Sequence, residues 1–262
     1  MRISVAEVCN LRPWSLRIGF AVGWRSAAGK NTGSNAAQRR LQTSATGFQF
    51  IVMKAITDCR LYGILDTGYC KPEAMPAMLA AMLRGGIDIV QLRAKELPPD
   101  RILELARDLH PHSMAAGVPF IINDHPSIAA AAGVEGAHVG QDDLNVADVR
   151  GLAGQGSIIG LSTHSLHQAT AAAAVRPDYI GFGPLFATPT KPDYVPIGMD
   201  GIAEVHRRVS LPVFCIGGIK RENLPQVIAA GARRVVIVSG ILTAEDPETY
   251  VRECAAMLEF RP

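Results

Sequence analysis

The sequence predicts an α/β fold, a (β/α)8 TIM barrel in a single domain, preceded by a disordered N-terminal extension. From Met53 onward, short apolar runs rich in Ile and Val alternate eight times with helical segments. The runs do not alternate between apolar and polar residues, as is typical of strands in a parallel sheet that is buried on both faces. Eight units in one body match a closed barrel. An open doubly wound sheet is less favoured because no G-x-G-x-x-G follows the first strand.

The eight expected strands are short, and Gly, Pro or polar residues bound most of them. Because their carboxyl ends share one rim in such a barrel, their order also predicts where polar loop residues meet. The strands are expected at Leu61–Leu65, Ile87–Leu92, Pro119–Ile122, Gly136–Val139, Ile158–Leu161, Tyr179–Phe182, Val213–Ile216 and Val235–Val238.

A helical segment follows each strand. The first one has a stripe that includes Met75 and Met82, which is typical of core packing. Glycines such as Gly85 and Gly133 lie just past helix ends, where a left-handed cap is common. The helices are expected at Glu73–Arg84, Asp100–Ala115, Ser127–Ala132, Val146–Leu152, Leu166–Val175, Gly201–Val209, Arg221–Ala230 and Glu248–Phe260.

Residues 1–52 lack the periodicity of the barrel domain, which is assigned to 53–262. They hold seven basic residues and one acid, and their small polar residues predict disorder. An Arg-rich, acid-poor segment is also typical of an organelle transit peptide. Translation that truly begins at Met53 is favoured over a transit peptide, and either way these residues stand outside the fold.

Composition excludes several classes of protein. Without residues 1–52 the body has a small net negative charge, which argues against nucleic acid as a partner. No apolar run is long enough to span a membrane. Five scattered cysteines form no C-x-x-C, so reduced thiols of a cytoplasmic protein are expected. Small molecules are the expected partners, and a homo-oligomer is left open.

Polar residues cluster after the expected strands, at the rim where TIM barrels place their active sites. Gln91, Arg93 and Lys95 follow the second strand, two residues apart on one side of an extended chain. Arg and Lys together suit an anion with several oxygens, such as a diphosphate. With Lys191 on the same rim, an anion site is favoured over a surface cluster of ion pairs.

The segment from Thr188 to Lys191 adds two hydroxyls, from Thr188 and Thr190, and an ammonium. A strand followed by a loop rich in donors suits an anionic group such as phosphate. Gly217–Gly218 and Val238–Ser239–Gly240 end the last two strands, whose loops often bind phosphate in barrels. Glycine there would let backbone N–H groups approach the anion closely.

Asp124 and Asp143 follow the third and fourth strands. Carboxylates from separate loops suit Mg²⁺ shared with a substrate phosphate. The alternative is helix N-capping, because each of them precedes a helix. Ser162 lacks a G-x-S-x-G setting, and His164 has no visible triad partner, so a protein nucleophile is not expected. Asp66 could be a loop residue or a rim contact.

Seven motifs in this order resemble the thiamine-phosphate synthase family over Leu61 to Phe260. Together they are far more specific than any one alone. They are Gln-Leu-Arg-x-Lys (91–95), Asn-Asp (123–124), His-Val-Gly-Gln-Asp-Asp (138–143), Gly-x-Ser-x-His (160–164), Gly-Pro-x-Phe-x-Thr-x-Thr-Lys (183–191), Ile-Gly-Gly-Ile (216–219) and Val-Ser-Gly-Ile (238–241).

The resemblance implies a transferase of thiamine biosynthesis. It would condense 4-amino-5-hydroxymethyl-2-methylpyrimidine diphosphate with 4-methyl-5-(2-phosphoethyl)thiazole, giving thiamine phosphate and diphosphate. By this resemblance Arg93, Lys95, Ser162 and Lys191 would be catalytic, and Asp124 and Asp143 would hold Mg²⁺. The pyrimidine diphosphate would be bound by Gln91, Arg93, Lys95, Asn123, Ser162 and Lys191, and the thiazole phosphate by Thr188, Thr190, Gly218, Val238 and Ser239.

Three positions depart from the family pattern. Ala94 replaces a frequent acid, Gln168 replaces a frequent Glu, and Pro192 stiffens the loop after Lys191. Two alternatives remain. A related thiazole tautomerase would share the barrel and a histidine like His164, but it should lack the two acids and the Thr-x-Thr-Lys stretch. A non-catalytic thiazole-phosphate-binding protein would keep Gly218 and Ser239. The charged residues that are predicted to bind the diphosphate would be replaced in it.

Overall fold

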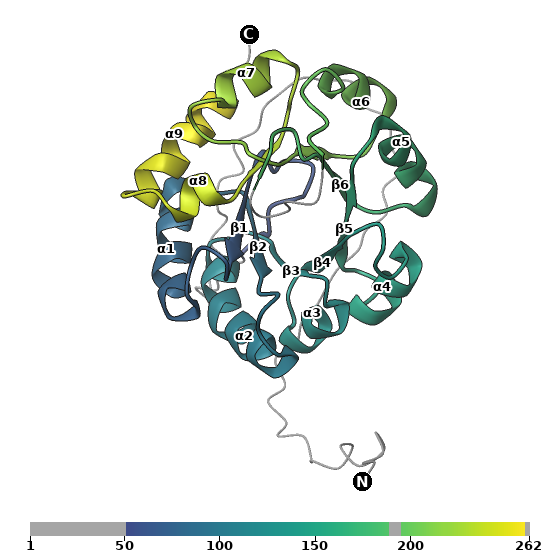
Figure 1. The fold of residues 1–262 in the computed structure, drawn as a ribbon. Helices are drawn as coiled ribbons and strands as arrows, with labels where there is room; N and C mark the ends of the chain where they lie inside the picture. The colour runs from purple at the N-terminus through teal and green to yellow at the C-terminus, as the bar shows by residue number, and fades with distance from the viewer. Residues whose placement is uncertain (1–50, 189–194, 260–262) are drawn as a thin grey trace, which may run out of the picture. The chain divides into compact units, whose positions relative to one another are not determined.

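The computed structural model describes residues 51–188 and 195–259, which belong to one compact unit. Eight parallel strands pair in sequence order, and β1 also pairs with β8, so the predicted (β/α)8 barrel is confirmed. Figure 1 looks into the ring of strands, with the helices around it. The disorder predicted for residues 1–52 falls, up to residue 50, outside the described residues and stays a prediction.

Each strand forms where the apolar run predicts one, within about two residues at either end. The residue pairing is continuous around the ring, from Tyr62 opposite Ile89 in the first pair to Cys215 opposite Val235 in the last. The strands are β1 Leu61–Asp66, β2 Ile89–Arg93, β3 Phe120–Asn123, β4 Gly136–Val139, β5 Ile158–Thr163, β6 Tyr179–Phe182, β7 Val213–Cys215 and β8 Val235–Ile237.

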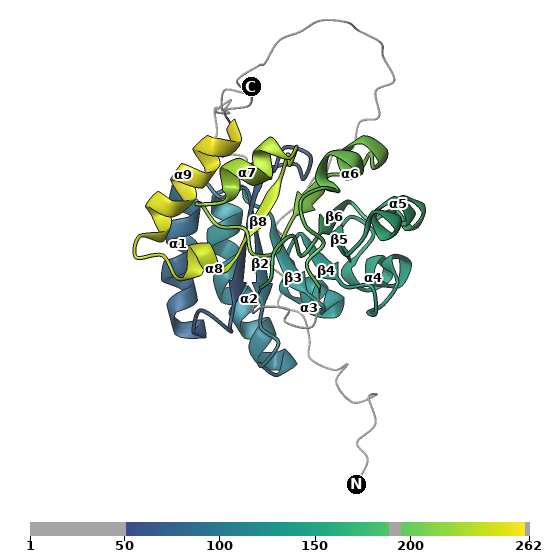
Figure 2. The same cartoon turned by 45° about the horizontal axis from the view of Figure 1, so that its top comes forward.

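All eight predicted helices are present, and one short helix that the sequence analysis missed, α8, follows β8 (Figure 2). Four residues containing a glycine give no periodic signal, so α8 could not be seen in the sequence. The helices are η1 Pro72–Ala74, α1 Met75–Gly85, α2 Pro99–Ala115, α3 Pro126–Ala132, α4 Val146–Ala153, α5 Leu166–Val175, α6 Ile202–Arg208, α7 Leu224–Ala229, α8 Ser239–Leu242 and α9 Pro247–Glu259.

Gly85 is not the left-handed cap that its position suggested. It is the last residue of α1, and Gly86 takes the left-handed conformation, with φ of 93°. A Cβ atom at Gly85 would lie 2.6 Å from the carbonyl oxygen of Glu248 and 2.7 Å from Cβ of Val251. Position 85 therefore requires a glycine, because α1 packs closely against α9, its neighbour in Figure 1.

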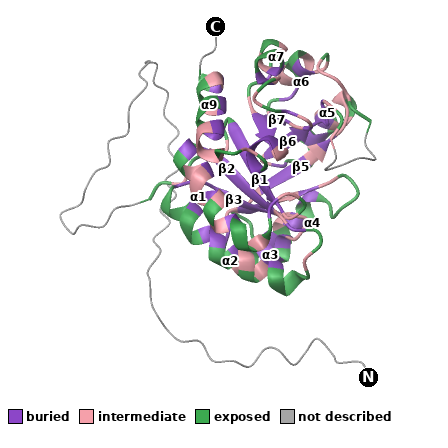
Figure 3. Cartoon of the chain, turned by 60° about the vertical axis from the view of Figure 1, so that its left-hand side comes forward, coloured by how far each residue is buried: buried purple, intermediate pink, exposed green. Residues whose placement is uncertain are grey.

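Two apolar layers surround the strands. An inner cluster fills the barrel and includes the fully buried rings of Tyr62, Tyr179 and Phe214. A larger outer cluster lies between the sheet and the helices, and Met75 and Met82 of the predicted stripe belong to it. In Figure 3 the strands are mostly buried, whereas the helices present exposed outer faces. Burial on both faces explains why the strand sequences do not alternate.

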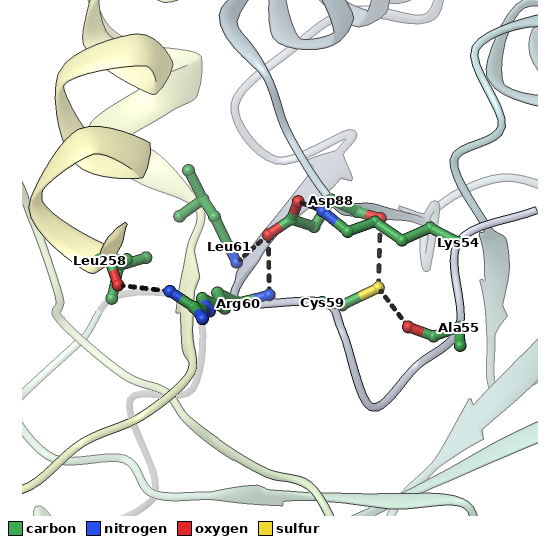
Figure 4. A network of polar contacts seen from close by, with 7 residues as sticks. All are labelled: Lys54, Ala55, Cys59, Arg60, Leu61, Asp88 and Leu258. Atoms are coloured by element: carbon green, nitrogen blue, oxygen red, sulfur yellow. Dashed lines mark hydrogen bonds and ion pairs between the residues drawn. The ribbon is translucent and has the colours of Figure 1, made fainter. Parts of the chain in front are cut away.

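At the amino end of the barrel, Asp88 ties the segment before β1 to the start of β2 (Figure 4). Its Oδ2 accepts hydrogen bonds from the backbone N–H of Arg60 at 2.7 Å and of Leu61 at 2.9 Å, and its other oxygen pairs with Lys54. The carboxylate thus satisfies backbone donors at the beginning of a strand, which would otherwise lack partners.

Two further acids repeat this arrangement. Glu135, just before β4, accepts from the N–H of Phe120 at the start of β3 (2.8 Å) and lies 3.1 Å from a ring nitrogen of His110. Asp178, just before β6, accepts from the N–H of Ile159 in β5 (2.8 Å) and pairs with Arg150 at 2.9 Å. Acids at this end of the barrel therefore accept hydrogen bonds from backbone N–H groups at the starts of strands.

The described cysteines are free and buried: Cys59, Cys70, Cys215 and Cys254. Burial raises the pKa of the Cys59, Cys215 and Cys254 thiols to about 12, so at neutral pH they hold their protons and react slowly. Among the described residues, no helix has the length and apolar composition that crossing a membrane requires.

Candidate active site

One cavity opens at the carboxyl ends of the strands, and it brings together residues from all eight strands or the loops after them. Its wall combines predicted substrate ligands with apolar residues of the barrel interior, such as Ile216. The predicted ligands that line it are Gln91, Arg93, Asn123, Ser162, Thr188, Gly218, Val238 and Ser239. Residues separated by up to 148 positions in the chain therefore face one space, as expected for a barrel active site.

Arg93 is fixed by Asp66, whose role the sequence left open. Asp66 ends β1, its side chain is 2% exposed, and its Oδ2 accepts from Arg93 Nη1 at 2.7 Å. Its Oδ1 accepts from the backbone N–H of Gly68 at 2.9 Å. The arginine is 15% exposed and borders both the cavity and a neighbouring groove that contains Lys95. Asp66 thus limits the positions that the guanidinium can take.

Lys95, Asp124 and Asp143 lie beside the cavity and do not line it. Lys95 Nζ is 3.5 Å from Asp124 Oδ2. Burial first, and then the charge of Asp143, raise the pKa of Asp124, while Lys95 lowers it. Asp143 Oδ2 accepts from the N–H of Gly140 at 2.6 Å. Asp124 also has a φ of 61°, unusual for a residue with a side chain.

The two acids do not serve as the side-chain caps that the alternative reading required. The helices that follow them begin after His125 and Asn145, and only Asn145 accepts a capping bond, from the N–H of Asp148. The remaining reading is a pair of carboxylates whose charges repel, which a cation would relieve. No cluster of three acidic, His or Cys ligands occurs among residues 51–188 and 195–259, so this pair would need oxygens from elsewhere.

Gly217 and Gly218 have φ of 99° and 65°, a backbone conformation that favours glycine. The loop after β6 also packs on them: Leu185 N–H donates to the Ile216 oxygen at 2.8 Å, and Phe186 N–H to the Gly217 oxygen at 3.1 Å. A Cβ at Gly218 would lie 2.6 Å from Cβ of Phe186. This packing requires the glycines independently of any anion.

The end of the loop that the sequence singled out is only partly described. Thr188 lines the cavity. Thr190, Lys191 and Pro192 lie outside the described residues, so their predicted roles stay predictions.

His164 is oriented by its backbone surroundings. Its Nδ1 lies 2.6 Å from the oxygen of Gly183, which can only accept, so Nδ1 holds a proton. The N–H of His164 donates to Gln168 Oε1 at 2.7 Å, and the N–H of Gln168 donates to Ser165 Oγ at 3.1 Å. The bond from the His164 N–H needs only a side-chain oxygen, which Gln supplies as well as Glu does. The Gln168 departure is therefore structurally neutral.

Two buried tyrosines and a half-buried histidine, none of which the sequence predicted as a ligand, connect two predicted ligands. Tyr62, Tyr179 and His138 form an unbroken series of hydrogen bonds between Gln91 of β2 and Ser162 of β5. A signal was available in the sequence, because polar residues inside otherwise apolar strands need partners. Their partners, however, come from other strands and are visible only in the folded chain.

The sequence and the fold both match known proteins. A model of the family described as thiamine monophosphate synthase matches residues 61–241. A thiamine-phosphate synthase of Chloroflexus aurantiacus is 39% identical over 204 residues, which are 78% of this chain and 94% of that protein. One from Shouchella clausii is 40% identical over 201 residues, covering 76% of this chain and 96% of that protein.

Solved structures agree with this assignment. The thiamine phosphate pyrophosphorylase from Pyrococcus furiosus superposes with a TM-score of 0.70 at 29% identity, covering 77% of this chain and 96% of that one. A 3-hexulose-6-phosphate synthase from Salmonella typhimurium gives a TM-score of 0.60 at 16% identity, which shows a shared barrel alone. By the family model and by relatives matched over nearly their whole length, this chain belongs to the thiamine monophosphate synthase family.

Proposed function

We propose that this protein condenses 4-amino-5-hydroxymethyl-2-methylpyrimidine diphosphate with 4-methyl-5-(2-phosphoethyl)thiazole, releasing diphosphate and forming thiamine phosphate. Membership of the family supports this reaction. The observation that carries the proposal is the single cavity lined by residues predicted for both substrates, such as Gln91 and Ser162 on one side and Thr188 and Ser239 on the other. Two reactants held in one space gain effective concentration.

The chemistry requires breaking the C–O bond to a diphosphate leaving group. Arg93 lines the cavity and Lys95 lines the groove beside it, and in this proposal their charges, with that of Lys191, neutralise the diphosphate. The amino group of the pyrimidine can delocalise, through the ring, the positive charge left on the exocyclic methylene carbon, and the thiazole nitrogen then supplies the electron pair for the new C–N bond. No protein nucleophile is needed for this reaction, because the electron pair comes from the thiazole nitrogen.

Asp124 and Asp143 fit a Mg²⁺ site that is completed by the substrate. Mg²⁺ in proteins commonly takes one or two carboxylates together with substrate phosphate oxygens. The raised pKa of Asp124, caused by burial and by Asp143, is the electrostatic condition that a bound cation relieves. Bound there, Mg²⁺ would supply further neutralisation of the leaving diphosphate.

The other predicted site residues complete the proposal. Asn123 would bind the pyrimidine diphosphate, and Gly218 and Val238 would bind the thiazole phosphate together with Thr190. The two alternative readings, a thiazole tautomerase and a non-catalytic binding protein, receive no support from the named relatives. Cytoplasmic location and homo-oligomer formation stay predictions.

The test is a coupled product assay. Purified full-length protein is incubated with both substrates, and thiamine phosphate is measured by mass spectrometry with Mg²⁺ and after chelation. Product that requires Mg²⁺ is expected. Binding of the thiazole phosphate without any product in the presence of Mg²⁺ would overturn the enzyme assignment in favour of the non-catalytic reading.

Lys191→Ala tests the loop residue. Loss of a charge-assisted contact to the leaving group should lower kcat by roughly 10- to 100-fold with little change in thermal stability. Arg101→Ala is the matched control, because Arg101 is 60% exposed on α2 and pairs with Glu104 on the same helix. An unchanged rate in Lys191→Ala would remove the role proposed for this lysine.

A further inference from the structure

The barrel interior holds a continuous series of four hydrogen bonds that crosses it from β2 to β5. Gln91 Nε2 donates to Tyr62 Oη at 2.7 Å, and Tyr62 Oη lies 3.0 Å from Tyr179 Oη. Tyr179 Oη lies 3.0 Å from His138 Nδ1, and His138 Nε2 lies 2.9 Å from Ser162 Oγ. We call these five residues the interior relay. Its two ends line the cavity, as do its three middle members.

The relay has a direction, because each hydroxyl holds one proton and can donate only once. Gln91 donates to Tyr62, and the direction that leaves no buried hydroxyl proton of this series without an acceptor sends the Tyr62 proton to Tyr179 and the Tyr179 proton to His138 Nδ1. A ring nitrogen that accepts is unprotonated, so the neutral imidazole of His138 has its proton on Nε2 and donates it to Ser162.

The direction fixes what each end presents to the cavity. The Gln91 amide uses Nε2 inside the relay, which leaves Oε1 as its acceptor. Ser162 Oγ accepts from His138, so its own proton is available for donation elsewhere. One end of the relay therefore presents an acceptor, and the other end presents a donor.

We propose that Tyr62, Tyr179 and His138 are positioning residues that set this acceptor and donor pattern for the pyrimidine diphosphate. This inference rests on the proposed function. An exocyclic amino group on the pyrimidine is a donor and matches Gln91 Oε1. The diphosphate is an acceptor and matches the Ser162 hydroxyl. If the direction were reversed, both matches would become clashes between like groups, which is costly in a site that excludes water.

Burial and packing hold the relay in place. Tyr62 and Tyr179 are 1% and 0% exposed, and burial raises the pKa of both phenols, so both remain protonated. Phe214 packs edge-on against the two rings, with centroids at 5.5 and 5.4 Å.

Gly160 makes room for the central bond. A Cβ atom at this position would collide with Tyr179 Cζ and with His138 Nδ1. The glycine two residues before Ser162, part of the Gly-x-Ser-x-His motif, is therefore required by the relay.

The direct test reads the tautomer of His138 by ¹⁵N NMR of histidine-labelled full-length protein, assigned with a His138→Gln variant. A protonated Nε2 and an unprotonated Nδ1 are expected in the neutral ring. A proton on Nδ1 would overturn the proposal. This readout needs no turnover, so it is independent of the product assay: an inactive protein defeats the proposed function, whereas an active protein with the Nδ1–H tautomer defeats only the relay.

Tyr179→Phe removes one hydroxyl from the centre of the relay and keeps the ring. The KM for the pyrimidine diphosphate should rise about tenfold, the scale of one misplaced hydrogen-bonding group, while the KM for the thiazole phosphate changes less than about twofold. The His138 ring should no longer prefer the Nε2–H tautomer over the Nδ1–H tautomer. Equal rises in both KM values, or an unchanged tautomer, would overturn the positioning role.

Two controls separate positioning from loss of stability. Ser113→Ala removes another buried hydroxyl, which donates to the Val118 oxygen at 2.5 Å outside the cavity, and should leave both KM values unchanged. Phe214→Leu weakens packing on both tyrosines without removing a relay bond, and should preserve the tautomer. Gly160→Ala should disturb the tautomer as Tyr179→Phe does. A change of tautomer in Phe214→Leu would show that packing alone sets it and would contradict the proposal.

Discussion

The two ends of the barrel use the same kind of side chain for different purposes. At the amino end, Asp88, Glu135 and Asp178 each accept from a backbone N–H at the start of a neighbouring strand and each face a basic side chain. At the carboxyl end, Asp124 and Asp143 lie close enough that their charges oppose each other. An acid whose oxygens are already bonded contributes stability, whereas a pair that repels is prepared for a cation.

The difference also explains an observation in the sequence. Polar residues follow the strands, while the opposite ends have mainly Gly, Pro and Asp. The acids at the opposite ends are part of the fold, because they occupy strand N–H groups that would otherwise be unsatisfied. In TIM barrels, function gathers at the carboxyl ends of the strands and stability at the amino ends. Substitutions at the two ends should therefore affect different measurements.

The largest effect is expected from Asp143→Asn at the carboxyl end. The amide keeps an oxygen that can accept from the N–H of Gly140 but has no charge for Mg²⁺. The kcat/KM should fall by about 100-fold or more, and the free energy of unfolding should change little. Steady-state product formation across a Mg²⁺ titration measures this. Wild-type turnover at every Mg²⁺ concentration would contradict the metal assignment.

Asp88→Ala at the amino end should show the opposite pattern. The Asp88 side chain is 14% exposed, and its loss leaves two strand N–H groups and Lys54 without their acceptor. The free energy of unfolding should fall by about 2–3 kcal/mol while kcat/KM is unchanged. Urea unfolding measures it. Asp178→Ala is the matched control, and its loss should be smaller because that side chain is 36% exposed.

Asp66→Asn tests an acid at the carboxyl end of the barrel that is bonded like the acids at the amino end. Asp66 accepts from a backbone N–H and pairs with a basic side chain. The amide still accepts from Gly68 but no longer holds Arg93 by charge. The KM for the pyrimidine diphosphate should rise roughly tenfold, and the KM for the thiazole phosphate should be unaffected. Separate titrations of the two substrates measure this. A rise in the thiazole KM of equal size would show a general disturbance of the cavity instead.

The smallest effect is a gain in stability from Asp124→Asn. Burial and Asp143 raise the pKa of Asp124 in the folded chain, so its ionised form disfavours folding. This contribution favours the folded state at low pH and is lost as pH rises through the raised pKa. Asn removes the unfavourable free energy of the buried charge, and it tolerates the positive φ of 61°. Thermal unfolding should show a higher Tm than wild type at pH 7, and the difference should vanish in acid.

Local patterns were enough to predict the elements of the barrel. The strands Gly136–Val139 and Tyr179–Phe182 and the helix Leu166–Val175 were located to the residue. The errors were local as well. The helix α8 was too short to give a period, and Gly85 was taken for a cap because the packing of α1 on α9 cannot be read from α1 alone.

The candidate site was predicted in part. Eight of the predicted ligands line the cavity, because strand order alone brings their loops to one rim. Asp66, Tyr62, Tyr179 and His138 were missed as partners of Arg93, Gln91 and Ser162. Each of those bonds joins different strands, so its existence depends on the register and on which side chains face inward.

The sequence by itself determined the barrel, the rim where the polar residues gather and the family of the protein. These follow from apolar periodicity and motif order, which are properties of short stretches. Only the tertiary structure decided that Asp66 holds Arg93, that the acids at the amino end satisfy strand N–H groups, and that a directed series of hydrogen bonds joins Gln91 to Ser162. Hydrogen-bond partners depend on distances between strands, and those distances exist only once the barrel has closed.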